Sequence, residues 1–180
     1  MKVREIINPW TDLSGYNCFG CSPNNPLGAH MRFYEDDPND RFGDIICVWQ
    51  PTQNHQSWIN TLHGGMQATL LDEVCGWVVF KKLNTSGVTA KMEIRYKHPI
   101  STISGPLLLK ARLKSDSHRV AMVEGEIWAK QSPEEPERKI CATAECTYFY
   151  FQDEKAREMG FREATLADTE TSLEQLVSPQ

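Results

Sequence analysis

The sequence predicts an α+β fold: an antiparallel sheet of about six strands and one long buried helix. The helix is expected over residues 62–80, a long apolar stretch without proline and rich in Leu, Ala, Met and Gln. Two strand-like segments precede this stretch and four follow it, with no helical segment between the four. Strands that follow one another without helical crossovers pair antiparallel, which gives the fold class.

Length and composition indicate one domain of ordinary size. The chain has 180 residues and a net charge of -5, with acidic and basic residues mixed throughout. No basic patch is dense enough to predict nucleic-acid binding. The helical stretch carries acidic residues in its middle and is followed at once by lysines, so we expect no membrane span. The N-terminus lacks the features of a secretory signal, and six cysteines in mainly apolar runs indicate reduced thiols, which predicts a cytoplasmic protein.

The expected elements follow in chain order. Residues 1–14 give little signal beyond one short helix, and the strands are expected at residues 29–35, 41–50, 88–98, 107–115, 120–130 and 139–151. We assign residues 1–151 to the main domain, with 1–27 as its lead-in. Residues 152–180 are expected to be an acidic tail that begins with a short surface helix and ends in a mobile or partner-covering stretch.

Cys18 and Cys21 have the spacing of metal ligands within the lead-in. A tetrahedral zinc site needs more ligands, and the chain has no second Cys-x-x-Cys pair. His30 or His55 could supply further ligands, but a turn-rich loop that packs Cys18 and Phe19 against the core is the favoured interpretation of the pair. We therefore predict no metal site.

Chemistry is expected at the start and in the middle of the long helix. The first N–H groups of a helix have no intrahelical partner and carry a partial positive charge. Gly64 and Gly65 would let a carbonyl oxygen or an oxyanion approach these groups. Asp72 lies about two turns further along the helix and is a candidate general base. Alternatively, the glycines form only a tight turn, and a partner helix or water satisfies Asp72.

The spacing argues against one helix supplying both groups to one site. Gly64 and Asp72 are eight residues apart, which is about 12 Å along a helix. His63 and Asp72 are nine residues apart, about 900° of rotation, so they point from opposite sides. If both groups serve one reaction, the second must come from another copy of the chain. A homodimer is therefore expected.

His63-Gly64-Gly65 followed by Asp72 resembles the hotdog-fold acyl-CoA thioesterases of the phenylacetate-pathway (PaaI-like) type. The resemblance implies that the sheet wraps around the helix and that two subunits pair edge to edge into a continuous sheet. It implies that the Gly64 N–H polarises the thioester carbonyl and that Asp72 of the facing subunit activates water or attacks directly. Thr89 occupies a position where the family has a hydroxyl facing the active site, although it could be an ordinary strand residue.

Further roles are expected around these groups. His63 is expected to cap or orient the helix entry, and Gln67 to border the site or the subunit interface. The family often has a side-chain amide six residues before the His, where this chain has Ser57. The nearby Asn60 is a second candidate, so we place His63, Gly65, Gln67, Ser57 and Asn60 at the substrate. The cations near strand ends that could bind the phosphates of coenzyme A are Lys91, Arg95, Lys97, Arg112 and Arg119.

The resulting expectation is a thioester hydrolase that uses no bound cofactor, because coenzyme A is part of its substrate. A dimer of dimers is compatible with the resemblance. Two alternatives stay open. The chain could be a non-catalytic hotdog protein that binds acyl-CoA as a sensor or carrier, although the acid at Asp72 argues against it. It could also be a hydratase or dehydratase of the same architecture, but those enzymes use a catalytic His near the helix.

Overall fold

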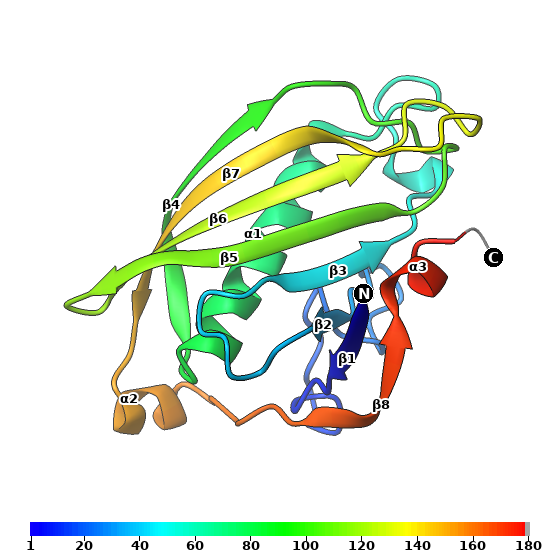
Figure 1. Ribbon diagram of the computed structural model, residues 1–180. Coiled ribbons are helices and arrows are strands. Elements are labelled where there is room, and N and C mark those ends of the chain that lie inside the picture. Colours follow the sequence, from blue (N-terminus) through cyan, green and yellow to red (C-terminus); the bar gives the residue numbers. More distant parts are fainter. Residues whose placement is uncertain (179–180) are drawn as a thin grey trace.

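The computed structural model describes residues 1–178, in which an antiparallel sheet curves around the long helix α1 (Gly64–Lys82) (Figure 1). The strands are β1 (Lys2–Ile6), β2 (Phe33–Glu35), β3 (Ile45–Trp49), β4 (Gly87–Tyr96), β5 (Leu107–Ser117), β6 (Val120–Ala129), β7 (Lys139–Tyr150) and β8 (Leu166–Ser172). Three short helices complete the fold: the 3-10 helix η1 (Gln53–His55), α2 (Asp153–Glu158) and α3 (Leu173–Leu176). The predicted α+β class is confirmed.

The strand order in the sheet is β4-β7-β6-β5-β3-β2-β1-β8, and every neighbouring pair is antiparallel. β4 directly follows α1 in the chain but forms one edge of the sheet, while β8 forms the other. The helix lies across the concave face, as the resemblance implied (Figure 1).

Two expectations for the chain ends are wrong. The sheet of residues 1–178 has eight strands rather than six, because β1 replaces the short helix expected in residues 1–14 and β8 lies in the tail. β8 pairs with β1, and a small apolar cluster holds the two ends together; it consists of Val3, Tyr34, Ile46 and Leu173. The tail stretch from residue 163 onward was expected to be mobile or to cover a partner, but most of its described part is folded onto the sheet.

The polar composition of β8 explains why it was missed. Only one face of an edge strand needs apolar cover, and the sequence Leu-Ala-Asp-Thr-Glu-Thr-Ser offers little alternation. Its position is fixed instead by backbone pairing and by the amino terminus of Met1, which lies 2.7 Å from Glu174 Oε1. The short surface helix expected after residue 152 is present as α2.

Helix α1 is buried on more than one side, as its dispersed apolar residues predicted. Its side chains Leu70, Leu71, Val74, Cys75 and Val78 are fully buried. Opposite the sheet, the N-terminal segment covers the helix through aromatic contacts. Trp10 packs on Phe80 with ring centroids 4.5 Å apart and meets Trp77 edge to face at 6.1 Å. The lead-in therefore forms part of the core.

The end of α1 is fixed by a buried ion pair. Lys82 Nζ lies 2.8 Å from Glu35 Oε2, and Lys81 Nζ lies 3.4 Å from Glu35 Oε1. The Lys82 ammonium also donates to the carbonyls of Asp37 and Asp40. These contacts connect the last turn of the helix to β2 and its following turn.

The six cysteines are all free thiols, as predicted. Within residues 1–178, no helix combines the length and the apolar character needed to cross a bilayer.

Candidate active site

The start of α1 leaves backbone N–H groups without a partner in residues 1–178, as expected for the first turn of a helix. His63 is the N-cap, and its Nδ1 accepts a hydrogen bond from the Gly65 N–H at 2.8 Å, so the capping role expected of His63 is present. Among the hydrogen bonds of residues 1–178, none uses the Gly64 N–H as donor. The Gly64 carbonyl accepts from the Tyr96 hydroxyl at 3.1 Å. The Gly64 amide is therefore available for a ligand.

Asp72 is held by two hydroxyl groups. Thr89 Oγ1 donates to Asp72 Oδ1 at 2.8 Å, and the Tyr148 hydroxyl approaches the same oxygen at 3.3 Å. Tyr148 also lies 3.0 Å from the Asp72 carbonyl oxygen. In the described part of the chain, Asp72 Oδ2 has no hydrogen-bond partner. The arrangement orients the carboxylate and leaves one oxygen to act on a water or a substrate.

Tyr148 was not predicted from the sequence. It lies on β7 directly opposite Thr89 of β4, so the two hydroxyls reach Asp72 as a cross-strand pair. Burial raises the pKa of Tyr148, which keeps the phenol protonated and a donor. The sequence alone does not reveal the role of Tyr148, because it does not show that β4 pairs with β7. Two other strands, β5 and β6, lie between them in the chain.

Asp72 and Gly64 face two different hollows of the single chain. Asp72 and Thr89 line a cavity of about 470 Å³ whose apolar wall includes Trp10, Trp77 and Phe80. Gly64 lines a separate hollow of about 290 Å³ with Gln67, Tyr96, Lys97, His98 and Pro99. One chain therefore does not bring the two groups into one pocket, in line with the spacing argument.

The remaining predicted residues are spread around the helix entry. Gln67 is buried; its Nε2 donates to the Leu62 carbonyl at 3.3 Å, and its Oε1 has no partner within residues 1–178. Ser57 Oγ lies 3.4 Å from the Thr61 carbonyl, and the Asn60 N–H donates to Gln56 Oε1. Ser57 and Asn60 line neither of the two hollows described above. Their place at the substrate remains a prediction.

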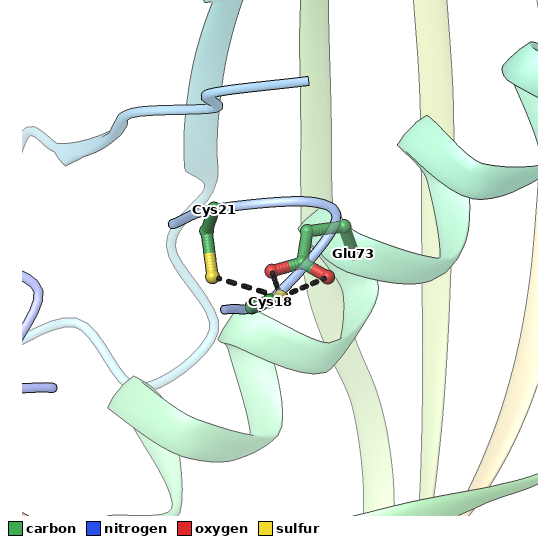
Figure 2. Close-up of side chains that lie close together, drawn as sticks. All are labelled: Cys18, Cys21 and Glu73. Carbon is green, nitrogen blue, oxygen red and sulfur yellow. Dashed lines mark hydrogen bonds between the residues drawn. The ribbon is translucent and has the colours of Figure 1, made fainter. Parts of the chain in front are cut away.

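A third group of side chains borders the Asp72 cavity. Cys18, Cys21 and Glu73 approach one another where the lead-in crosses α1 (Figure 2). Hydrogen bonding from Cys21 lowers the pKa of Cys18 to about 5, whereas burial raises that of Glu73 to about 7. The same Cys18 contact, followed by burial, raises the pKa of Cys21. The sequence does not place Glu73 beside the two cysteines, since spacing does not reveal contact with a loop 55 residues earlier.

His30 and His55 do not join the two cysteines. His30 Nε2 contacts the Asn25 carbonyl, while His55 Nδ1 accepts from the Thr52 N–H at 3.0 Å. The His55 ring packs on Trp49. Neither histidine belongs to the Cys18–Cys21–Glu73 cluster.

The antiparallel sheet around one long helix is the architecture that the resemblance implied, and solved thioesterase structures share it. Residues 59–135 match the family model of the thioesterase superfamily. This range contains Gly64, Asp72 and Thr89. The resemblance inferred from His63-Gly64-Gly65 and Asp72 is thereby confirmed.

The comparisons include one curated relative in two species. The chain is 34% identical over 58 residues to acyl-coenzyme A thioesterase 13 of Homo sapiens and of Pongo abelii. That match covers 32% of this chain, and the chain spans only 41% of the length of these relatives.

Two solved structures show the same fold. A putative thioesterase of Ralstonia eutropha JMP134, described as phenylacetic acid degradation-related, has a TM-score of 0.59 and 21% identity, covering 73% of this chain and 92% of its own. A hypothetical thioesterase of Streptococcus pneumoniae TIGR4, solved with coenzyme A, has a TM-score of 0.54 and 19% identity, covering 66% of this chain and 87% of its own.

Proposed function

We propose that the protein is an acyl-CoA thioesterase whose active site is shared between two copies of the chain. Asp72 of one copy would act on the thioester, while the Gly64 N–H of the other polarises its carbonyl. The observation that carries this proposal is the position of the two groups at opposite ends of one unpaired edge strand, β4. Thr89 contacts Asp72 near the start of β4, and Tyr96 contacts Gly64 at its end.

The edge of β4 is suited to pairing with a second copy. The strand has ten residues, most of them exposed on both faces; Val88 is 48% exposed and Tyr96 is 55% exposed. A long free edge with unpaired backbone groups is a template for another strand. Two β4 strands that pair antiparallel about a two-fold axis extend the sheet continuously across the dimer.

This pairing brings the separated groups together. Thr89 and Tyr96 are seven residues apart, roughly 24 Å along a strand. In an antiparallel pair centred between Met92 and Glu93, Thr89 of one strand lies beside Tyr96 of the other. The Asp72 carboxylate of one copy then approaches the Gly64 amide of its partner. A dimer has two such sites, each built from both chains.

The chemistry follows from the two groups. The Gly64 N–H would stabilise the oxyanion that forms when the thioester carbonyl is attacked. Asp72, oriented by Thr89 and Tyr148, would take a proton from the attacking water or attack the carbonyl itself. Breakdown of the tetrahedral intermediate breaks the C–S bond, and the leaving thiolate takes up a proton. Where Asp72 itself attacks, this step leaves the acyl group on Asp72 as a mixed anhydride, which water then hydrolyses. The products are a carboxylate and free coenzyme A, and no cofactor is required.

The surroundings support an acyl-CoA substrate. The cavity beside Asp72 has apolar walls that include Trp10, Trp77 and Phe80, which suit a small or medium acyl or aryl group. Lys97 lines the hollow at Gly64 and is the best placed of the predicted phosphate ligands. The curated relatives are named for acyl-coenzyme A, and the streptococcal structure contains coenzyme A.

The test is an assay of thiol release from a panel of aliphatic and aryl-CoA thioesters. Wild type should turn over at least one class, and Asp72→Asn should abolish that turnover. Asp168→Asn, which makes the same change at an exposed acid of β8, should leave the rate unchanged. Equal rates in wild type and Asp72→Asn would remove Asp72 from the mechanism. Tight binding of the thioesters without hydrolysis would favour the sensor or carrier instead.

A further inference from the structure

The cluster of Cys18, Cys21 and Glu73 brings three ligand-type side chains to one point (Figure 2). The two thiols come from the lead-in loop, and the carboxylate comes from the middle of α1. Their ligand atoms all lie within 4.8 Å of one another. Cys18 Sγ is 3.4 Å from Cys21 Sγ and 3.7 Å from Glu73 Oε1.

These separations fit a tetrahedral metal ion. Zinc binds cysteine sulfur at about 2.3 Å and carboxylate oxygen at about 2.0–2.2 Å, which places tetrahedral ligands about 3.8 Å (S to S) and about 3.6 Å (S to O) apart. The observed distances differ from these by only a few tenths of an ångström. Small side-chain rotations would therefore complete the coordination.

The cluster also lacks a positively charged partner among the described residues. None of the ion pairs formed within residues 1–178 includes Glu73, and its neighbour along the helix is a second acid, Asp72. Three acidic groups that share a half-buried position without a positive partner are unfavourable when ionised. A divalent ion bound among them would compensate this charge.

The side chains behind the ligands are arranged to orient them. Trp77 Nε1 donates to Glu73 Oε1 at 3.1 Å, and the Tyr16 hydroxyl lies 2.9 Å from Cys21 Sγ. Asn8 in turn donates to the Tyr16 hydroxyl at 3.0 Å. Hydrogen-bonded partners of this kind fix the ligands of metal sites.

Gly20 shows that the loop is shaped around the carboxylate. A Cβ at Gly20 would lie 2.4 Å from Glu73 Cδ and from Glu73 Oε2. Any larger residue at position 20 would therefore displace the Glu73 carboxylate from its place beside the two cysteines. The three ligand-type residues also line the cavity beside Asp72, which gives an ion an entry path and leaves one coordination position for water.

We propose that Cys18, Cys21 and Glu73 bind a zinc-type divalent ion that fastens the lead-in loop to α1. Thiolate ligands select zinc over magnesium and calcium. The ion would fix the position of the cavity wall next to Asp72. This site would be a property of the chain that is separate from thioester hydrolysis.

The test uses the full-length protein, reduced and stripped of metal, and titrated with cobalt(II) and then zinc. Wild type should bind a single cobalt ion per chain, with thiolate-to-cobalt charge-transfer absorption and the visible bands of tetrahedral cobalt, and zinc should displace it. Cys18→Ser and Cys21→Ser should lose the charge-transfer absorption. Cys141→Ala, which removes a thiol outside the cluster, should bind like wild type.

Two further variants distinguish a metal site from simple packing. Trp77→Phe keeps an aromatic side chain but removes the hydrogen bond to Glu73, and should weaken zinc binding by about 10- to 100-fold. Glu73→Gln keeps the size of the side chain and should weaken binding further. The proposal is overturned if wild type binds zinc no better than Cys18→Ser. It is equally overturned if Cys18 and Cys21 form a disulfide in mildly oxidising buffer that saturating zinc does not prevent.

Discussion

Thr89 and Tyr148 face each other across β4 and β7 and both direct their hydroxyl groups at Asp72 Oδ1, at 2.8 and 3.3 Å. The pair fixes the carboxylate of a helix residue from the sheet that covers it. Orientation of this kind matters because a base or nucleophile works only when it is held in reach of the reacting atom. In the proposed dimer, the edge strand β4 would thus contribute to the chemistry as well as to assembly.

Removal of the Thr89 hydroxyl should slow catalysis without unfolding the protein. Thr89→Val has nearly the same shape but no donor, and loss of a hydrogen bond to a charged group is worth about 1.5 kcal/mol, or about tenfold in kcat. Thr89→Ser keeps the donor and should retain most of the activity. Steady-state kinetics of the two variants make the comparison. Equal losses in both would assign the effect to packing.

The Gly64 amide can be deleted without changing the helix. Gly64 is the first residue of α1, and His63 before it is extended at φ -62° and ψ 136°, so proline is acceptable there. Gly64→Pro should lower kcat by about 10²- to 10³-fold, the usual cost of an oxyanion donor. Gly64→Ala keeps the N–H, and its Cβ would lie 3.7 Å from the Tyr96 ring, an ordinary contact. This control should stay close to wild type in the same assay.

Light scattering should give a mass twice the 20.5 kDa of the chain. In the proposed dimer, the outward amides of β4 are hydrogen-bonded to the partner strand. Hydrogen exchange over residues 87–96 should therefore be slow at high protein concentration and faster on dilution. A mass of one chain, with alternate β4 amides exchanging freely at every concentration, would contradict pairing through this edge.

Mutation of the buried ion pair between Lys82 and Glu35 at the end of α1 should strongly lower the stability of the protein. Glu35 is 1% exposed and the Lys82 side chain 2% exposed, so Lys82→Met would leave a buried carboxylate without its closest partner. We expect a loss of about 3–5 kcal/mol in the free energy of unfolding, measured by denaturant titration. The double variant Glu35→Met/Lys82→Met removes both charges and should recover much of this loss. A double variant as unstable as Lys82→Met would show that the other contacts of Lys82 matter more.

The sequence was sufficient for the parts of the fold that depend on local pattern. The apolar run gave α1 to within two residues at each end, and alternating segments gave the strands β2 to β7. β1 and β8 were missed because each is short or polar and is stabilised by pairing between the two ends of the chain. Strand propensity depends on the local sequence and does not reveal pairing between distant segments.

The residues of the candidate site also fall into those that the local sequence predicts and those that it does not. Gly64, Asp72 and Thr89 came from one continuous stretch and from the resemblance it carries. Tyr148 and the Cys18–Cys21–Glu73 cluster depend on contacts between distant segments, which only the tertiary structure reveals. The eight-residue spacing of Gly64 and Asp72 nevertheless predicted that a single chain keeps them apart, and the two separate hollows agree with it.

A complementation experiment tests the shared active site most directly. Asp72→Asn and Gly64→Pro are mixed under conditions that exchange subunits, and thiol release is compared with that of each variant alone. If the site is shared, each mixed dimer contains one intact pair of groups, and random exchange should restore about a quarter of the wild-type rate. A mixture no more active than the two separate variants would show that the groups do not act across the dimer.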